Sequence, residues 1–180
     1  MQNLTRDGRE IGLPGYIPLA TRTGRAIPNV QDPDMPPWRI EQYLRRFRKL
    51  FPRPELRRGP TGRYNCHGMT FASRRTQILA PDSRETITEI VMNILGDDGY
   101  REIRLQEAMQ GDVVVYYDGN EISHTGIIVE IESDDRVIGG RAVKVMSKWG
   151  PGGEYLHYVN ECPDAGTPGK KATYWTDRDG

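Results

Sequence analysis

Among the side chains that can act as nucleophiles, the thiol of Cys66 has the most suggestive sequence context. It lies in the segment 63–70, where a helix is expected to begin. The N–H groups and the dipole at a helix start favour a thiolate, which is the attacking form of cysteine. The same N–H groups can receive the negative charge that develops on a carbonyl oxygen under attack. The segment therefore predicts that Cys66 is a nucleophile.

A matching general base is suggested by His124, which opens the apolar run 124–131. This run is typical of a buried strand, and an imidazole on a rigid strand can be held within hydrogen-bond reach of a nucleophile. Gly126 follows two residues later, so it should share the face of His124 and leave room beside the ring. The pattern predicts that His124 accepts the proton of Cys66.

A third residue is expected to fix the tautomer of this imidazole. If the strand that begins at His124 pairs with the next expected strand, Ala142–Ser147, the residue facing His124 lies near Ser147. The hydroxyl of Ser147 can accept the imidazole N–H. The alternatives are His157 and Glu154, which follow a glycine-rich turn. The sequence leaves the choice among these three open.

Three further residues, His67, Lys148 and Cys162, stand near these motifs. His67 is poorly placed as the base for Cys66, because adjacent helix residues point about 100° apart. Three alternatives stay open for it: it crowds the cleft, contacts substrate or caps the helix locally. Lys148 is expected to raise the local positive potential rather than to orient an imidazole. Cys162 lies beside a proline in a loop-like stretch and is expected to be structural.

No metal and no nucleotide cofactor are expected. The thiols and imidazoles have spacings that match none of the usual zinc motifs. The chain also lacks a glycine-rich phosphate loop of the Walker or dinucleotide type. The residues considered for zinc are Cys66, His67, His124, His157 and Cys162.

Hydrophobic periodicity predicts the elements that must position these residues. Helices are expected over 38–51, from about Cys66 to Leu79, and from Ser83, with Thr86 in the first turn, to Gly96. Residues 53–63 are expected to form a loop. Strands are expected at Tyr100–Arg104, Gly111–Tyr117, His124–Ile131, Ala142–Ser147, Glu154–Val159 and Ala172–Trp175. Helices followed by an antiparallel meander are typical of an α+β fold.

The N-terminal stretch differs from the rest of the chain. Residues 1–37 contain six prolines and show little periodicity, which predicts an extended arm or a segment wrapped on the domain behind it. Residues 38–180 are expected to form a single domain. A partner protein is most plausible at this arm or at the basic face of the helix 38–51. The basic residues of that helix are Arg39, Arg45, Arg46, Arg48 and Lys49.

Three motifs carry a resemblance to a known family. The run Asn65-Cys66-His67-Gly68-Met69 is similar to the Asp-Cys-Ser-Gly-Leu nucleophile motif of NlpC-type peptidases. The strand 111–116 resembles the Gly-Asp-Leu-Val-Phe-Phe strand of that family. The run His124-Thr125-Gly126-Ile127-Ile128 resembles its His-Val-Gly-Ile-Tyr strand. The motifs stand in the family's order over about residues 64–148, and the related CHAP-like amidohydrolases share this layout.

The resemblance implies a papain-like NlpC-type fold, with helices packed on an antiparallel β-sheet and, in this chain, an added Pro-rich N-terminal arm. It implies a cysteine peptidase or amidase that cleaves an amide or peptide bond, with peptidoglycan peptides as the commonest substrate. It also implies that the Tyr64 hydroxyl assists the Cys66 N–H at the oxyanion. His67 replaces the family's small serine. The alternatives are an inactive papain-like binding module and an acyltransferase that uses the same Cys-His pair.

Composition limits the partners further. The chain carries 25 basic and 25 acidic residues, so it has no overall field that would attract nucleic acid, and none is expected as a partner. No apolar run approaches the ~20 residues needed to span a bilayer. The polar start lacks the apolar core of a signal peptide. The default expectation is therefore a cytoplasmic protein, with non-classical export as the alternative.

Overall fold

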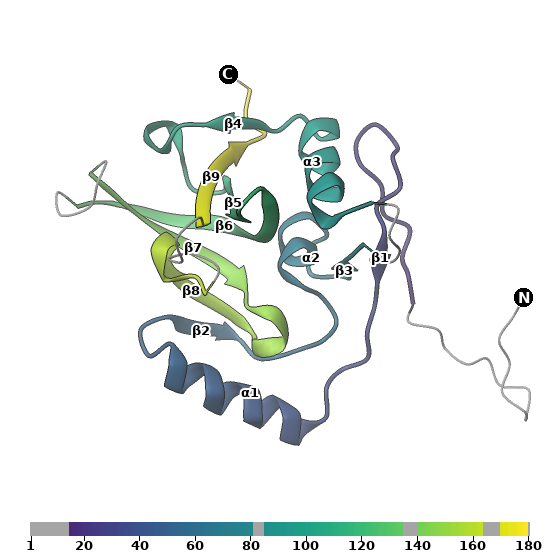
Figure 1. Ribbon diagram of the computed structural model, residues 1–180, viewed down its shortest axis with the longest axis vertical. Helices are drawn as coiled ribbons and strands as arrows, with labels where there is room; N and C mark the ends of the chain where they lie inside the picture. Colours follow the sequence, from purple (N-terminus) through teal and green to yellow (C-terminus); the bar gives the residue numbers. More distant parts are fainter. Residues whose placement is uncertain (1–14, 81–84, 135–139, 164–169, 180) are drawn as a thin grey trace, which may run out of the picture.

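The computed structural model describes residues 15–80, 85–134, 140–163 and 170–179. Within these ranges the chain has three α-helices and a seven-stranded antiparallel sheet, so the expected α+β class is confirmed (Figure 1). The helices are α1 (Pro37–Leu50), α2 (Cys66–Phe71) and α3 (Ile87–Asp97). None of these described helices has the length and apolar character needed to cross a membrane.

The strands of the large sheet lie in the order β2-β8-β7-β6-β5-β9-β4. Their bounds are β2 (Glu55–Arg58), β4 (Arg101–Ile103), β5 (Val113–Asp118), β6 (Glu121–Ser133), β7 (Arg141–Lys148), β8 (Glu154–Tyr158) and β9 (Lys170–Thr176). A separate pair joins β1 (Asn29–Val30) to β3 (Gln77–Ile78). Short 3-10 turns lie at η1 (Leu105–Glu107), η2 (Gly150–Gly152) and η3 (Val159–Glu161). Strand β2 lies inside the stretch that the sequence predicts to be a loop.

The two faces of the sheet are covered differently. On one face, here called the helix face, Val113 and Val115 of β5 pack with Val91 and Leu95 of α3. On the other, here called the back face, the next residues of β5 belong to a second core. That core contains Ile103, Ala108, Val114, Tyr116, Ile128, Val143, Val145 and Cys162. Because successive strand residues point to opposite faces and register partners share a face, the face of a paired residue in β5 to β8 follows from its partner.

Helix α2 begins at Cys66, where the side chain of Asn65 caps it. Asn65 Oδ1 accepts hydrogen bonds from the N–H of Gly68 (2.9 Å) and of Ile78 (3.1 Å), which ties the helix start to β3. A Cβ at Gly68 would lie 1.7 Å from the carbonyl oxygen of Thr76, so only glycine fits between helix and strand. The sequence thus places the helix start well, because asparagine is a strong N-cap.

The predicted end of α2 is wrong. The sequence predicts a helix to about Leu79, whereas the structure ends it at Phe71. Ser73 and Arg74 follow with φ of 51° and 66°, in the left-handed region that a right-handed helix cannot contain. The chain then turns into β3, and the side chain of Arg74 comes to lie beside the site described below.

Helix α3 buries one face, made of Ile90, Val91, Ile94 and Leu95. Thr86 is its N-cap and forms a reciprocal capping box with Glu89. Ile90 and Ile94 pack with Ile27 from the N-terminal stretch, and Arg25 from the same stretch binds Asp97 at 2.7 Å. The expected start at Ser83 lies outside the described residues.

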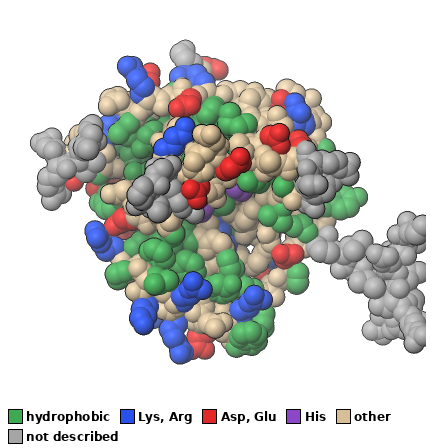
Figure 2. Space-filling view, in the orientation of Figure 1, with side chains coloured by type: hydrophobic (Ala, Val, Ile, Leu, Met, Phe, Trp, Pro, Cys, Tyr) green, Lys and Arg blue, Asp and Glu red, His purple; other side chains and the backbone are tan. Residues whose placement is uncertain are grey.

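Helix α1 packs at one end of the sheet. The ring of Phe47 lies 6.1 Å from that of Trp149 and 5.9 Å from that of Tyr155. A Cβ at Gly152 would lie 2.4 Å from the Phe47 ring, so the η2 turn sits directly against the helix. Figure 2 shows basic side chains gathered over the end of the molecule where α1 lies.

Candidate active site around Cys66

Cys66 is the first residue of α2 and is 8% exposed. Its carbonyl accepts a hydrogen bond from Thr70 Oγ1 at 3.0 Å, and the capping bonds of Asn65 hold the preceding turn. The backbone around the thiol is therefore fixed from both sides. With only six residues, α2 offers a weaker dipole than a long helix, so nearby side-chain charges weigh more in the chemistry of Cys66.

One such charge belongs to Lys148, the last residue of β7, which is 0% exposed. Its Nζ donates to the carbonyl of Gly150 and lies 5.5 Å from the centre of the Tyr64 ring. Lys148 interacts electrostatically with Cys66 and with Glu154, its register partner on β8. Burial lowers the pKa of Lys148 to about 8, although Cys66 and Glu154 both act to raise it.

Glu154 is buried and has a full set of strong partners. It accepts from Tyr64 Oη at 2.7 Å and from Arg74 at 2.6 and 3.1 Å. Arg58 approaches the same carboxylate at 3.6 Å. Burial alone would raise the pKa of Glu154, but the bonds from Arg74 and Tyr64 prevail and lower it. The sequence connects Glu154 only with His124, whereas the structure places it in a charge cluster beside Lys148.

This cluster changes the expected role of Tyr64. Burial, followed by the hydrogen bond to Glu154, raises the pKa of its hydroxyl. The O–H proton is directed to the carboxylate of Glu154. A phenol has one proton to donate. Assistance at an oxyanion, as the family resemblance implies, would require Tyr64 to give up this bond.

The side of β6 that faces α2 is identified by Thr125. Its Oγ1 lies 3.1 Å from His67 Nδ1 and 3.1 Å from Thr70 Oγ1, both on α2. His124 precedes it and therefore points to the back face. There the imidazole lies 5.6 Å from the ring of Tyr116, its register partner on β5. The pairing of His124 with Cys66 stays a prediction from the sequence, and the direction of the β6 side chains counts against it.

The structure places three of the predicted site residues, His124, Ser147 and His157, on the same back face of the sheet. Gly126 pairs with Ser147, so Ser147 lies one step along the same face from His124. A Cβ at Gly126 would lie 2.5 Å from Val145 Cγ1, which explains the need for glycine at this crowded place. His157 pairs with Val145 and so shares that face.

The side chain of Ser147 forms a hydrogen bond with the imidazole of His157. His157 Nδ1 lies 2.8 Å from the carbonyl of Tyr158, which can only accept, so Nδ1 carries the proton. His157 Nε2 therefore accepts from Ser147 Oγ at 2.7 Å. Ser147 Oγ in turn accepts from Trp149 Nε1 at 2.9 Å. These bonds form a chain between β7 and β8 beneath α1.

All three histidines are buried, and each has a lowered pKa. Burial lowers the pKa of His67 and of His157 to about 4. Burial, with added repulsion from the other two, lowers the pKa of His124 well below its ordinary value. The imidazoles are therefore neutral at neutral pH, and Lys148 is the buried cation beside Cys66.

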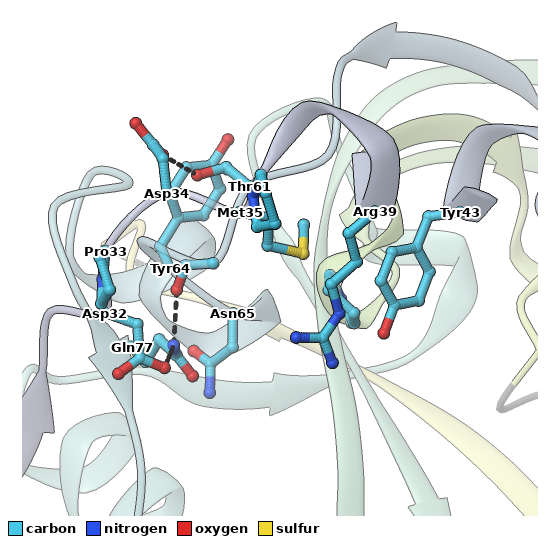
Figure 3. A pocket seen from close by; sticks show the side chains of 14 residues that line it. Asp32, Pro33, Asp34, Met35, Arg39, Tyr43, Thr61, Tyr64, Asn65 and Gln77 are labelled. Atoms are coloured by element: carbon cyan, nitrogen blue, oxygen red, sulfur yellow. Dashed lines mark hydrogen bonds between the residues drawn. The ribbon is translucent and has the colours of Figure 1, made fainter. Parts of the chain in front are cut away.

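A pocket of about 490 Å³ opens beside this cluster (Figure 3). Tyr64 and Asn65, which precede the thiol, form part of its wall, as does Gly150, whose carbonyl binds Lys148. Figure 3 shows Arg39 and Tyr43 lying together along the α1 side. The lining residues are Asp32, Pro33, Asp34, Met35, Pro36, Arg39, Tyr43, Thr61, Gly62, Tyr64, Asn65, Gln77, Gly150 and Pro151.

Sequence reasoning gives Lys148 only a general electrostatic role and does not consider Arg74 as a site residue. The sequence does contain a signal that could have identified Lys148. It is a lysine at the end of a buried strand, opposite a glutamate across a glycine-rich turn. Cys162 lies in the back-face core at 1% exposure. Within the described ranges no three His, Cys, Asp or Glu side chains gather so as to hold a metal ion.

Comparison with protein-family models, curated proteins and solved structures found no match.

Proposed function

We propose that this chain is a cysteine-dependent hydrolase of amide or peptide bonds, with Cys66 as the nucleophile. The observation that carries the proposal is the buried charge of Lys148 beside a cysteine on the first turn of α2. A positive charge in a low-dielectric site favours the thiolate over the thiol. The adjoining pocket, whose wall includes Tyr64 and Asn65, gives a substrate a place to bind beside the two residues that precede Cys66.

The chemistry follows the usual course of a thiol hydrolase. The thiolate attacks the carbonyl carbon, and the C=O electron pair moves onto the oxygen. The backbone N–H of Cys66, at the start of α2, is proposed to donate to this oxyanion. The C–N bond then breaks, the amine leaves with a proton, and water releases the acyl group from sulfur. The sequence predicts His124 as the proton carrier for these steps.

The pocket supports a peptide as the substrate class. Arg39 contributes a guanidinium on one side, while Asp32 and Asp34 contribute carboxylates. Both carboxylates already accept hydrogen bonds, from Gln77 at 2.7 Å and Thr61 at 2.9 Å, so the wall is preorganised. A lining with both charge signs suits a peptide better than a uniformly charged polymer. Cell-wall peptides stay the particular substrate that the family resemblance implies.

The papain-like NlpC-type arrangement is part of the same proposal. It is supported by the chain order of α2, α3, β5, β6 and β7, which is the order of the family's motifs. The inactive binding module is the second candidate. It is favoured by one observation, namely that β6 directs Thr125 rather than His124 toward α2.

Thiol reactivity separates these two candidates. We expect iodoacetamide to alkylate Cys66 near neutral pH much faster than Cys162, which lies in the back-face core and serves as the internal control. Peptide mass spectrometry reads both sites in one sample. The Cys66→Ala variant should also lose hydrolysis of p-nitrophenyl acetate. Equally slow alkylation of both cysteines, or full hydrolysis by Cys66→Ala, would favour the binding module.

A further inference from the structure

We propose that Lys148 is the general base and general acid of this site, taking the proton of Cys66 and returning it to the leaving group. The inference rests on the proposed function, since it needs Cys66 as the nucleophile. It deepens that function by assigning the proton transfer to a lysine on the helix face of the sheet. His124 then has no part in the transfer.

The first argument is the position of Lys148 under α2. Ile127 pairs with Met146 and Gly126 with Ser147, so the next position along the register sets Thr125 beside Lys148. Thr125 bonds to His67 and Thr70 of α2, so this part of the helix face lies directly beneath the helix that begins with Cys66. The electrostatic interaction between Lys148 and Cys66 agrees with this placement.

The second argument is that no carboxylate neutralises this lysine. Lysine is almost never fully buried unless it is paired. In the described part of the chain, no carboxylate lies within ion-pair distance of Lys148, and its nitrogen donates to the carbonyl of Gly150. Glu154 faces it across the register, but that carboxylate is already bound by Tyr64 and Arg74. The ammonium form is thus poorly compensated, and the neutral amine is accessible.

The groups that face Lys148 come from every element packed around it. Its charged neighbours raise its pKa, whereas its burial lowers it. Cys66 and Glu154 favour its charged form. Burial disfavours it, and the net result is a pKa of about 8. Such a value, near neutral pH, lets one group both accept and donate a proton. The facing groups are Cys66 of α2, Tyr64, Thr125 of β6 with His67 bound to it, and Glu154 of β8 with Arg74 and Arg58 behind it.

The proton balance closes over one turnover. The neutral amine of Lys148 takes the S–H proton, which gives the ammonium–thiolate pair of the proposed function. The thiolate sulfur then forms its bond to the carbonyl carbon, and the C=O electron pair moves onto the oxygen. When the tetrahedral intermediate collapses, the C–N bond breaks and the leaving nitrogen takes the proton from the Lys148 ammonium. The neutral amine next takes a proton from water, whose oxygen attacks the thioester. The C–S bond breaks, and the ammonium returns its proton to the sulfur.

The test compares two variants in the full chain with p-nitrophenyl acetate as the probe. In Lys148→Arg the charge is kept but the proton is held too tightly to be transferred, since arginine has a pKa above ~12. We expect a burst of about one equivalent of nitrophenolate from acylation of Cys66, followed by a stall, because deacylation lacks its base. In Lys148→Met the charge is lost as well, and alkylation of Cys66 by iodoacetamide at pH ~7 should slow by about tenfold or more.

Two outcomes overturn the inference while leaving the proposed function intact. One is Cys66-dependent turnover that persists in Lys148→Arg. The other is a loss of rapid Cys66 alkylation in His124→Gln but not in Lys148→Met. Hydrolysis that survives in Cys66→Ala would instead remove the proposed function itself.

A measurement on the unmodified chain covers the case in which a lysine variant fails to fold. The ¹³Cε resonance of Lys148 reports its protonation directly. We expect its titration midpoint to lie well below that of the surface lysines, and to move when iodoacetamide blocks Cys66. A midpoint in the ordinary range for lysine, near ~10.4, would overturn the inference.

Discussion

The Oγ1 of Thr125 lies 3.1 Å from Nδ1 of His67, and this contact identifies which side of β6 lies against α2. Thr70 reaches the same hydroxyl at 3.1 Å, so two side chains of the helix meet one of the strand. The consequence is that the residue before Thr125 points away from Cys66. On the helix face, Lys148 lies opposite Glu154, whose carboxylate is bound by Tyr64 and Arg74.

Loss of the Thr125 hydroxyl should loosen this junction. Thr125→Val keeps the side-chain volume but leaves the buried His67 Nδ1 without its partner. An unsatisfied buried polar group typically costs about 1–3 kcal/mol. We expect a loss of that size in the free energy of unfolding, measured with urea. Thr125→Ser is the control, because it keeps the hydroxyl, and equal stability of the two variants would contradict this account.

The contact between α2 and β3 predicts a strong effect of one methyl group. Gly68→Ala would place a Cβ 1.7 Å from the Thr76 carbonyl oxygen, so helix and strand would have to separate. Overpacking of a rigid site costs about 1–3 kcal/mol or more. The matched control is Gly96→Ala in α3, where a Cβ meets nothing within 4 Å. There we expect a gain of about 0.5–1 kcal/mol from helix propensity.

Thermal melting of both glycine variants measures this contrast. The melting temperature should fall for Gly68→Ala and should hold or rise for Gly96→Ala. A Gly68→Ala chain as stable as the unmodified one would show that helix and strand do not meet as described.

The buried histidines predict that stability depends on pH. The pKa of His67 and of His157 is lowered to about 4, whereas an unfolded histidine titrates near ~6.5. Between these values the unfolded state binds more protons, so stability falls as pH falls from about 6.5 to about 4. Urea unfolding at several pH values measures the slope. His157→Gln should reduce it, and a flat profile across this interval would contradict the burial of neutral imidazoles.

The charge cluster predicts that Glu154 matters more than a surface carboxylate. Glu154→Gln removes the charge that Arg74 binds in a buried setting, and breaking such a pair costs about 3–5 kcal/mol when both partners are buried. Arg74 is partly exposed, so we expect about 2–3 kcal/mol here. The control is Asp34→Asn, which breaks the exposed 2.7 Å pair with Arg63 and should cost under about 1 kcal/mol. Chemical denaturation distinguishes the two, and similar losses would argue against the cluster.

The sequence predicts the helices and strands better than it predicts which face of the sheet their side chains occupy. The strands after Gly99 and the helix that starts near Trp38 are found within a few residues of their expected bounds. Strand β2 escapes prediction because all four of its residues are exposed and show no alternation. The early end of α2 depends on left-handed backbone at Ser73 and Arg74, which ordinary residue types do not announce.

Hydrophobic periodicity could not predict to which face of the sheet His124 points, because β6 contains an extra residue before it. Tyr116 pairs with His124 and Tyr117 with Ile122, so Ser123 is an extra residue in β6. One such residue decides which neighbour faces the helix. The run after it is apolar on both faces, so its pattern does not reveal the side. Lys148 was hidden in a similar way, since a lysine at a strand end usually reaches solvent.

The η2 turn, Gly150–Gly152, contacts both Lys148 and helix α1. Its first residue holds Lys148 through a carbonyl, and its last lies against Phe47 of α1. Helix α1 also supplies Arg39 and Tyr43 to the pocket. We therefore expect that a ligand which displaces this helix also shifts the carbonyl that binds Lys148.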